Sequence, residues 1–138
     1  MNAMAGRYYH VAIVVEDLDA AIAELGPLLG ISWEEPRDRE MHGVPFRMAY
    51  SRGAPPWIEL LERSEGTPFD TLGLHHVGVW TEDHEADKRR LAEAGLELEL
   101  DGVPIGRVFS LHRAAASGLR VELVDASVRE EFDARLNP

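Results

Sequence analysis

Apolar positions along the chain form two short runs of the same kind, one near residue 10 and the other near residue 76. The stretch "HVAIVVED" begins at His10, and "HVGVWTED" begins at His76. Each run contains several β-branched residues and ends in an acidic pair, which predicts a buried strand followed by the start of a helix. Because both copies share the initial histidine and the acidic end, the pattern indicates an internal repeat.

A helical pattern follows each of the two runs. The first predicted helix covers residues 17–30, with Asp17 as the N-cap and Gly30 as the stop signal. Pro27 lies inside it and predicts a kink or an early end of the last turn. The second predicted helix covers residues 82–95, with Asp83 near its start and Gly95 as the C-terminal signal.

The remaining strands complete the same order of elements in both halves. Two strands are expected at about 31–35 and 44–51, and two more at about 96–101 and 105–113; the closing strands are "WIELLE" (57–62) and "RVELVD" (120–125). The sequence therefore predicts an α+β protein, a single domain over 1–138 made of two tandem β-α-β-β-β modules. The modules cover about 8–63 and 74–125, with a turn-rich linker at 64–73 and a tail at 126–138 that is a short amphipathic helix or a frayed end.

Composition and charge exclude several classes of protein. The chain has 138 residues, of which 45% are hydrophobic and 28% charged, as in ordinary globular domains. Its formal net charge of -11 repels phosphate backbones, so no nucleic-acid partner is expected. No apolar stretch approaches the ~20 residues of a membrane span. The first ten residues lack the apolar segment of a signal peptide, and we expect a cytoplasmic protein.

The repeat brings four residues with metal-binding chemistry to equivalent positions: His10 and Glu59 in the first half, His76 and Glu122 in the second. Each glutamate lies within an apolar strand, where a buried carboxylate is costly unless it is paired or binds a metal. Two imidazoles and two carboxylates suit Zn²⁺, Ni²⁺, Co²⁺, Fe²⁺ or Mn²⁺ better than Ca²⁺. On spacing alone, internal ion pairs or solvated strand ends remain the alternative.

The paired modules, the strand-opening histidines and the closing "ELL" and "ELV" strands resemble the vicinal-oxygen-chelate superfamily. This superfamily includes glyoxalase I, methylmalonyl-CoA epimerase, extradiol dioxygenases and bleomycin-resistance proteins. The resemblance implies a glyoxalase-like fold, in which the modules form a cupped, partly open mixed sheet around a divalent metal. It also implies that His10, Glu59, His76 and Glu122 are the metal ligands. His75 points to the face opposite His76, so both cannot bind one metal, and His75 is expected to be either a hydrogen-bonded histidine at the edge of the linker or a partner of a metal ligand.

The segments "LHHVGVW" and "SLHRAAASGLRVELVD" resemble sequences of the methylmalonyl-CoA epimerase branch and its glyoxalase-like relatives. This likeness implies an isomerase, epimerase or lyase that transfers a proton next to a metal-bound carbonyl through an enolate, with an acyl-CoA as one candidate substrate. Glu122 and Glu59 would be the catalytic carboxylates. The epimerase's second base aligns with Met41, between Glu40 and His42, and residue 59 is Glu where that enzyme typically has Gln.

Two other functions are consistent with the same fold. One is a lactoylglutathione lyase of the glyoxalase I type, and the other is a binding or resistance-type protein without turnover. For a small-molecule carbonyl substrate, six residues are expected to line the site: Phe46, Met48, Trp57, Trp80, Phe109 and His112. Arg47 and Arg107 are either anion contacts or surface residues. In this superfamily modules pair within a chain or across a dimer, so a homodimer is one expected assembly.

Overall fold

The computed structural model describes residues 7–41 and 43–138, and within it the chain divides into two compact units. We call them the His10 unit and the His76 unit. The His10 unit contains His10–His75 and the C-terminal segment Asp133–Pro138, and the His76 unit contains His76–Phe132 and the described residues up to Tyr9. The first ten residues were expected to lack a signal peptide, and residues 1–6 of them lie outside the described residues.

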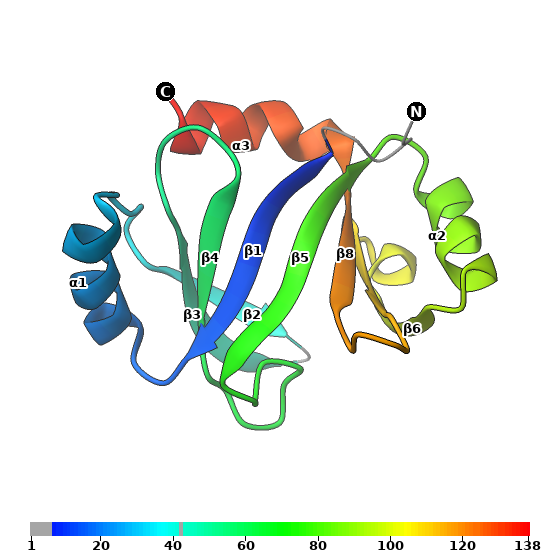
Figure 1. Cartoon of the computed structure of the whole chain (residues 1–138), viewed down its shortest axis with the longest axis horizontal. Helices are drawn as coiled ribbons and strands as arrows, with labels where there is room; N and C mark the ends of the chain where they lie inside the picture. The colour runs from blue at the N-terminus through cyan, green and yellow to red at the C-terminus, as the bar shows by residue number, and fades with distance from the viewer. Residues whose placement is uncertain (1–6, 42) are drawn as a thin grey trace. The chain divides into compact units, whose positions relative to one another are not determined.

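The His10 unit contains the first β-α-β-β-β series. Its elements are β1 (Tyr8–Val15, from His10 onward), α1 (Leu18–Leu29), β2 (Arg37–Met41), β3 (Val44–Tyr50) and β4 (Trp57–Glu62). β1 and β4 pair in parallel, whereas β3 pairs with both β4 and β2 in antiparallel fashion. Figure 1 shows β1 and β4 side by side, although they are separated in sequence by the other three elements. This pairing brings the first and last strands of the module together.

Helix α1 begins and ends where the sequence predicts. The Asp17 side chain accepts a hydrogen bond from the Ala20 backbone N–H, and Gly30 adopts the left-handed conformation with φ 66°. Pro27 does not end the helix, which continues to Leu29. α1 packs beside β3 and β4 (Figure 1), and its apolar side covers one face of these strands. The resulting core is formed by Leu18, Ala49 and Leu60, with Ile13, Val15, Ala21, Ile22, Leu25, Trp33 and Ile58 packed around them.

The His76 unit repeats this order. Its elements are β5 (Gly73–Thr81, from His76 onward), α2 (His84–Glu93), β6 (Glu97–Asp101), the 3-10 helix η1 (Val103–Ile105), β7 (Phe109–Arg113), β8 (Arg120–Asp125) and η2 (Ala126–Val128). β5 and β8 are parallel, and β7 pairs antiparallel with both β8 and β6. α2, capped by Asp83, packs against β8. The α+β fold with two β-α-β-β-β modules is thereby confirmed.

Two of the predicted strands differ from expectation. The strand expected at 31–35 lies instead at Arg37–Met41, and within 31–35 only Trp33 forms an isolated bridge, to Ser51. Pro36 separates the two segments, and it lacks the N–H that a continuous strand would use. The strand expected at 105–113 begins only at Phe109, because η1 and the turn that follows it occupy the preceding residues.

The C-terminal tail contains a helix, α3 (Arg129–Leu136). Its Phe132 belongs to the His76 unit, whereas its last turn belongs to the His10 unit. Leu136 is fully buried, so the tail is an ordered part of the fold and not a frayed end. Among the described residues, no helix has the length and apolar character needed to cross a bilayer.

Candidate metal and active site

His10 and Glu59 form a buried pair in the His10 unit. Parallel pairing of β1 with β4 places His10 opposite Trp57 and Ala12 opposite Glu59, so all four residues lie on one face of the strands. The His10 Nε2 atom is 3.3 Å from the Glu59 Oε1 atom. His10 is fully buried, and Glu59 is 8% exposed. The pair therefore lies on the face opposite the α1 core, because Leu60 and Ile58 alternate toward the helix.

The surroundings of this pair are largely aromatic. Tyr50 lies directly opposite Glu59 in the antiparallel register, and its ring meets the His10 ring edge to face at a centroid distance of 5.6 Å. The buried Trp57 side chain donates from Nε1 to the Gly53 carbonyl at 2.7 Å. These packed rings hold the imidazole and the carboxylate in a setting of low dielectric, where charge–charge interactions are strong.

His76 and Glu122 form the corresponding pair in the His76 unit. β5 and β8 are parallel, and Gly78 lies opposite Glu122, so His76 shares a face with Glu122. The His76 Nε2 atom is 3.5 Å from the Glu122 Oε1 atom, and the His76 side chain is buried. The structure thus places a histidine and a glutamate together in each unit, on the first and last strands of the module.

The chemistry of both pairs fits a divalent cation. Each pair offers one imidazole nitrogen and one carboxylate oxygen from strands whose other residues are mainly apolar. His10, Glu59 and His76 are buried residues whose side chains offer ligand atoms suited to a metal. A borderline cation such as Zn²⁺ or Co²⁺ accepts these donor types, and it offsets the cost of burying the carboxylates.

Three expected site residues of the His10 unit share the face of its His–Glu pair. Met48 lies opposite Leu61, and Trp57 lies opposite His10, which places both on this face. Phe46 alternates with Met48 to the same side, and its ring packs against Phe69 at a centroid distance of 5.1 Å. These side chains are positioned to form the apolar surroundings of the pair.

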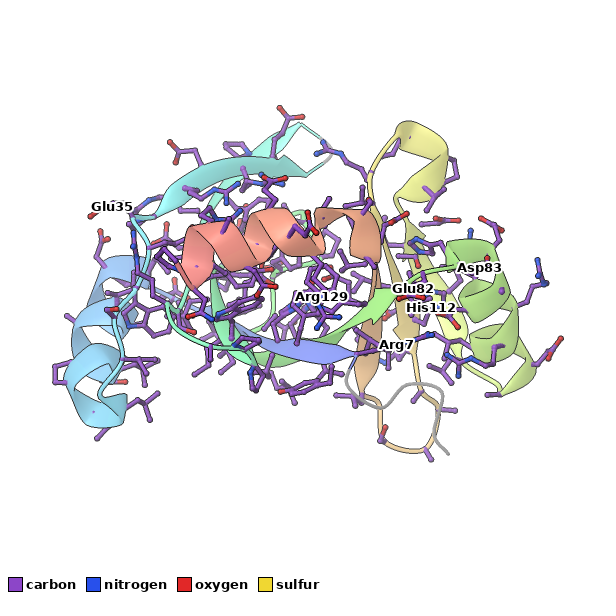
Figure 2. The ribbon with its side chains drawn as sticks, turned by 90° about the horizontal axis from the view of Figure 1, so that it is seen from above. Arg7, Glu35, Glu82, Asp83, His112 and Arg129 are labelled. Carbon is purple, nitrogen blue, oxygen red and sulfur yellow. The ribbon has the colours of Figure 1, made fainter. Side chains whose placement is uncertain are left out.

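In the His76 unit, two expected residues lie on the Glu122 face and one does not. Trp80 and Phe109 both lie opposite Val124, which alternates with Glu122 to the same side. Trp80 stacks on Tyr9 at a centroid distance of 3.7 Å. His112 is three residues from Phe109 and therefore points to the other face. Figure 2 shows His112 beside α2.

His112 takes part in a hydrogen-bonded chain that the sequence analysis did not identify. The Ser110 hydroxyl lies 2.7 Å from Nε2 of His84 on α2 and 2.8 Å from Nε2 of His112. Because this hydroxyl has one proton, it donates to one imidazole and accepts from the other. Burial lowers the pKa of both histidines, and the positive charge of Lys88 acts in the same direction. Both imidazoles are therefore favoured in the neutral form.

Three further residues were named in the sequence analysis. Two of them lie away from the His–Glu pairs, and the third is not among the described residues. His75 donates from Nε2 to the Pro68 carbonyl at 2.9 Å, as expected for a histidine outside the metal site. Glu40 is exposed on β2, where it lies opposite Pro45. His42, the other candidate for a second base, lies outside the described residues.

Comparisons with known proteins agree with this fold. Residues 9–115 match the Glyoxalase/Bleomycin resistance protein/Dioxygenase superfamily. The chain is 37% identical over 133 residues to an ethylmalonyl-CoA/methylmalonyl-CoA epimerase from Cereibacter sphaeroides, covering 87% of this chain and 98% of that protein.

Solved structures of epimerases share the architecture. One is a methylmalonyl-CoA epimerase in complex with methylmalonyl-CoA and NH4+, with a TM-score of 0.65, 22% identity, and coverage of 96% of this chain and 98% of that one. Another is methylmalonyl-CoA epimerase from Mycobacterium tuberculosis, with a TM-score of 0.63, 20% identity, and 91% of each chain covered. At these identities the likeness supports the fold itself.

Proposed function

Because the chain belongs to the Glyoxalase/Bleomycin resistance protein/Dioxygenase superfamily, we propose that it is a divalent-metal-dependent epimerase of a small acyl-CoA thioester. The observation that carries this proposal is the repeated His–Glu pair, His10 with Glu59 and His76 with Glu122, of which all but the partly exposed Glu122 are buried. The name of the Cereibacter sphaeroides relative supports the substrate class, since that protein acts on ethylmalonyl-CoA and methylmalonyl-CoA.

In this proposal the four residues together hold one divalent cation. When bound, such a cation supplies Lewis acidity, which lowers the free energy of negative charge developing on a carbonyl oxygen. The two histidines contribute neutral nitrogen donors, and the two glutamates contribute oxygen donors, of which one is ionised and one protonated at each end of the reaction. The packed aromatic side chains around His10 limit access of water to this side of the site.

The glutamates then perform the proton transfer. A carboxylate oxygen of one glutamate removes the proton from the carbon next to the thioester carbonyl, and the C–H electron pair moves into the enolate of the substrate. The carboxyl group of the other glutamate returns a proton to the opposite face of that carbon, which inverts its configuration. We assign these two roles to Glu122 and Glu59, because each lies on the closing strand of its module beside a buried histidine.

Metal content and hydrogen exchange test the proposal together. Protein purified without chelator is expected to contain about one equivalent of a first-row divalent metal by elemental analysis. In D2O, the protein should catalyse exchange of the proton at C2 of methylmalonyl-CoA or ethylmalonyl-CoA, followed by NMR. Removal of the metal with a chelator should stop the exchange, and its return should restore it.

A pair of adjacent substitutions supplies the matched control. His76→Ala should lose both metal and exchange, whereas His75→Ala should keep both, because His75 bonds the Pro68 carbonyl. Circular dichroism establishes that both variants are folded. Ligand binding without exchange would instead identify a binding protein of this fold, and turnover of a glutathione hemithioacetal would identify a lyase of the glyoxalase I type. Metal-free protein that catalyses no exchange would contradict the proposal.

A further inference from the structure

Two arginines approach one buried carboxylate in the His10 unit. Glu34 is 5% exposed, and its Oε2 atom accepts a hydrogen bond of 2.9 Å from the Tyr50 backbone N–H. Its Oε1 atom receives a hydrogen bond of 3.1 Å from Nε of Arg135 on α3. Nη1 of Arg37, at the start of β2, lies 3.8 Å from the same oxygen. A single carboxylate thus lies between two guanidinium groups.

The strand register places this group on the face that carries His10 and Glu59. Arg37 lies opposite Met48, which shares that face, and Tyr50 lies directly opposite Glu59. The Arg135 guanidinium carbon is 6.0 Å from the centre of the Tyr50 ring. A single aromatic side chain therefore lies next to Arg135 on one side and to the His10–Glu59 pair on the other.

Arg37 has hydrogen-bonding capacity that the protein does not use. Its distance of 3.8 Å from Glu34 is longer than a hydrogen bond, and in the part of the chain that the structure describes its guanidinium contacts no other acceptor. The side chain is 35% exposed, so a ligand can reach it. Burial lowers the pKa of Arg37, and the positive charges of Arg135 and Arg39 act in the same direction. The nearby Glu34 carboxylate raises that pKa, but its Oε1 atom already accepts a hydrogen bond from Arg135, so the two guanidinium groups face a single carboxylate and leave an excess of positive charge for an anion.

Arg47, on the neighbouring strand β3, differs from Arg37 in having its donors engaged by the protein. It lies opposite Asp38 and points to the α1 face, where it donates two hydrogen bonds to the Asp19 carboxylate. Its donors are therefore engaged with a residue of the protein. Arg37, by comparison, points to the face of the proposed active site with its donors available.

We infer that Arg37, with Arg135 beside it, binds the free carboxylate of a malonyl-type acyl group, the class of substrate in which the thioester acyl chain ends in a second carboxylate. This inference rests on the function proposed above. A guanidinium binds a carboxylate through two parallel N–H···O bonds, which fixes both the position and the rotation of the acyl group. The same contact would select dicarboxylic acyl groups over simple ones.

The acyl carboxylate fits this place better than a phosphate of coenzyme A. In a malonyl thioester, the carboxylate is attached to the reacting carbon itself, whereas the phosphates lie at the far end of the pantetheine arm. Arg135 approaches Tyr50, which is directly opposite the proposed catalytic Glu59, and Arg37 lies opposite Met48 on the same face. A carboxylate bound there remains close to the carbon from which a proton is removed.

Binding of two thioesters that differ only in the carboxylate tests the inference. Isothermal titration calorimetry of the metal-loaded protein is carried out with malonyl-CoA and with propionyl-CoA. Arg37→Gln should weaken malonyl-CoA binding about tenfold, the loss expected for one charge-assisted contact, while propionyl-CoA binding changes less than about twofold. Arg37→Lys should recover only part of the loss. Arg47→Gln, which removes the same charge from the α1 face, should alter neither ligand.

The outcomes separate this inference from the proposed function. Equal weakening of both thioesters by Arg37→Gln would assign the arginine to a phosphate of coenzyme A and overturn the inference. An unchanged preference for malonyl-CoA in a folded Arg37→Gln variant would also overturn it, while exchange at C2 of methylmalonyl-CoA would leave the proposed function in place. If the wild-type protein bound neither thioester and catalysed no exchange, the proposed function would fail and the inference with it.

Discussion

Ala49 and Ser110 occupy corresponding positions in the two units. Ala49 lies opposite Leu60, the residue after Glu59, and Ser110 lies opposite Leu123, the residue after Glu122. Both are completely buried on the helix-covered face. Ala49 belongs to a cluster of apolar side chains, whereas the hydroxyl at the corresponding position joins two imidazoles.

The helix-covered faces therefore differ in chemistry although the strand registers correspond. The buried cluster under α1 is apolar, and the polar contact of Arg47 with Asp19 on that side is exposed. Under α2 a second buried polar contact accompanies the Ser110 hydrogen bonds: the Thr81 hydroxyl donates to Asp87 at 2.6 Å. On the opposite face the two units retain the same type of pair, His10 with Glu59 and His76 with Glu122. The two units thus share the His–Glu pair on one face, while the buried residues of the helix-covered face differ.

The largest expected effect tests whether the two glutamates are also equivalent in function. Glu122→Gln and Glu59→Gln each remove the proton acceptor while keeping the side chain's size. We expect either change to lower kcat for C2 epimerisation about 10²–10⁴-fold, the usual contribution of a general acid or base. Epimerisation followed by circular dichroism and deuterium exchange followed by NMR give the two rates. A Glu59→Gln variant with full activity would restrict proton transfer to the His76 unit.

The next effect compares the cores of the two units. Leu60 and Leu123 are fully buried at corresponding positions. Truncation to alanine at either should lower the free energy of unfolding by about 2–5 kcal/mol, with the greater loss at Leu60, where the neighbours form a continuous apolar cluster. Urea unfolding measures both. A loss below about 1 kcal/mol at either position would contradict the tight packing described above.

The next prediction exchanges the residue types at the two corresponding positions, Ala49 and Ser110. Ala49→Ser introduces a hydroxyl among apolar side chains, and Ser110→Ala removes the group that joins His84 to His112. Each should lower the free energy of unfolding by about 1–3 kcal/mol, because each leaves a buried polar group without a hydrogen-bond partner. Ser32→Ala at an exposed position serves as the control and should have little effect. If Ser110→Ala left the free energy of unfolding unchanged, the His84–Ser110–His112 hydrogen bonds would not stabilise the fold.

Sequence periodicity predicted the parts of this molecule that repeat. The paired runs at His10 and His76, the caps Asp17 and Asp83, and the closing strands all follow local rules of spacing and capping. Phe109 and His112 were both expected to line the site. They are three residues apart on β7, so strand alternation alone predicts that their side chains point to opposite faces.

Sequence periodicity did not predict contacts that differ between the two units. The Arg135–Glu34 hydrogen bond joins residues 101 positions apart, and the His84–Ser110 bond joins residues 26 apart. Among residues 7–41 and 43–138, neither contact has a counterpart in the other unit, so the repeat gave no signal for it. Such contacts depend on how the elements pack, which neither helical nor strand periodicity encodes.

The smallest expected effect is a pH dependence that arises in the His76 unit. Burial lowers the pKa of His84 and His112 in the folded protein, and Lys88 adds to this, although Asp101 acts in the opposite direction on both. Below the unfolded-state value of about 6.5, the unfolded chain therefore binds more protons than the folded one. The free energy of unfolding should fall as the pH drops from about 7.5 through about 6.5. Urea unfolding at several pH values should show a smaller fall in a His84→Gln, His112→Gln double variant, and identical slopes would mean that these histidines titrate alike in both states.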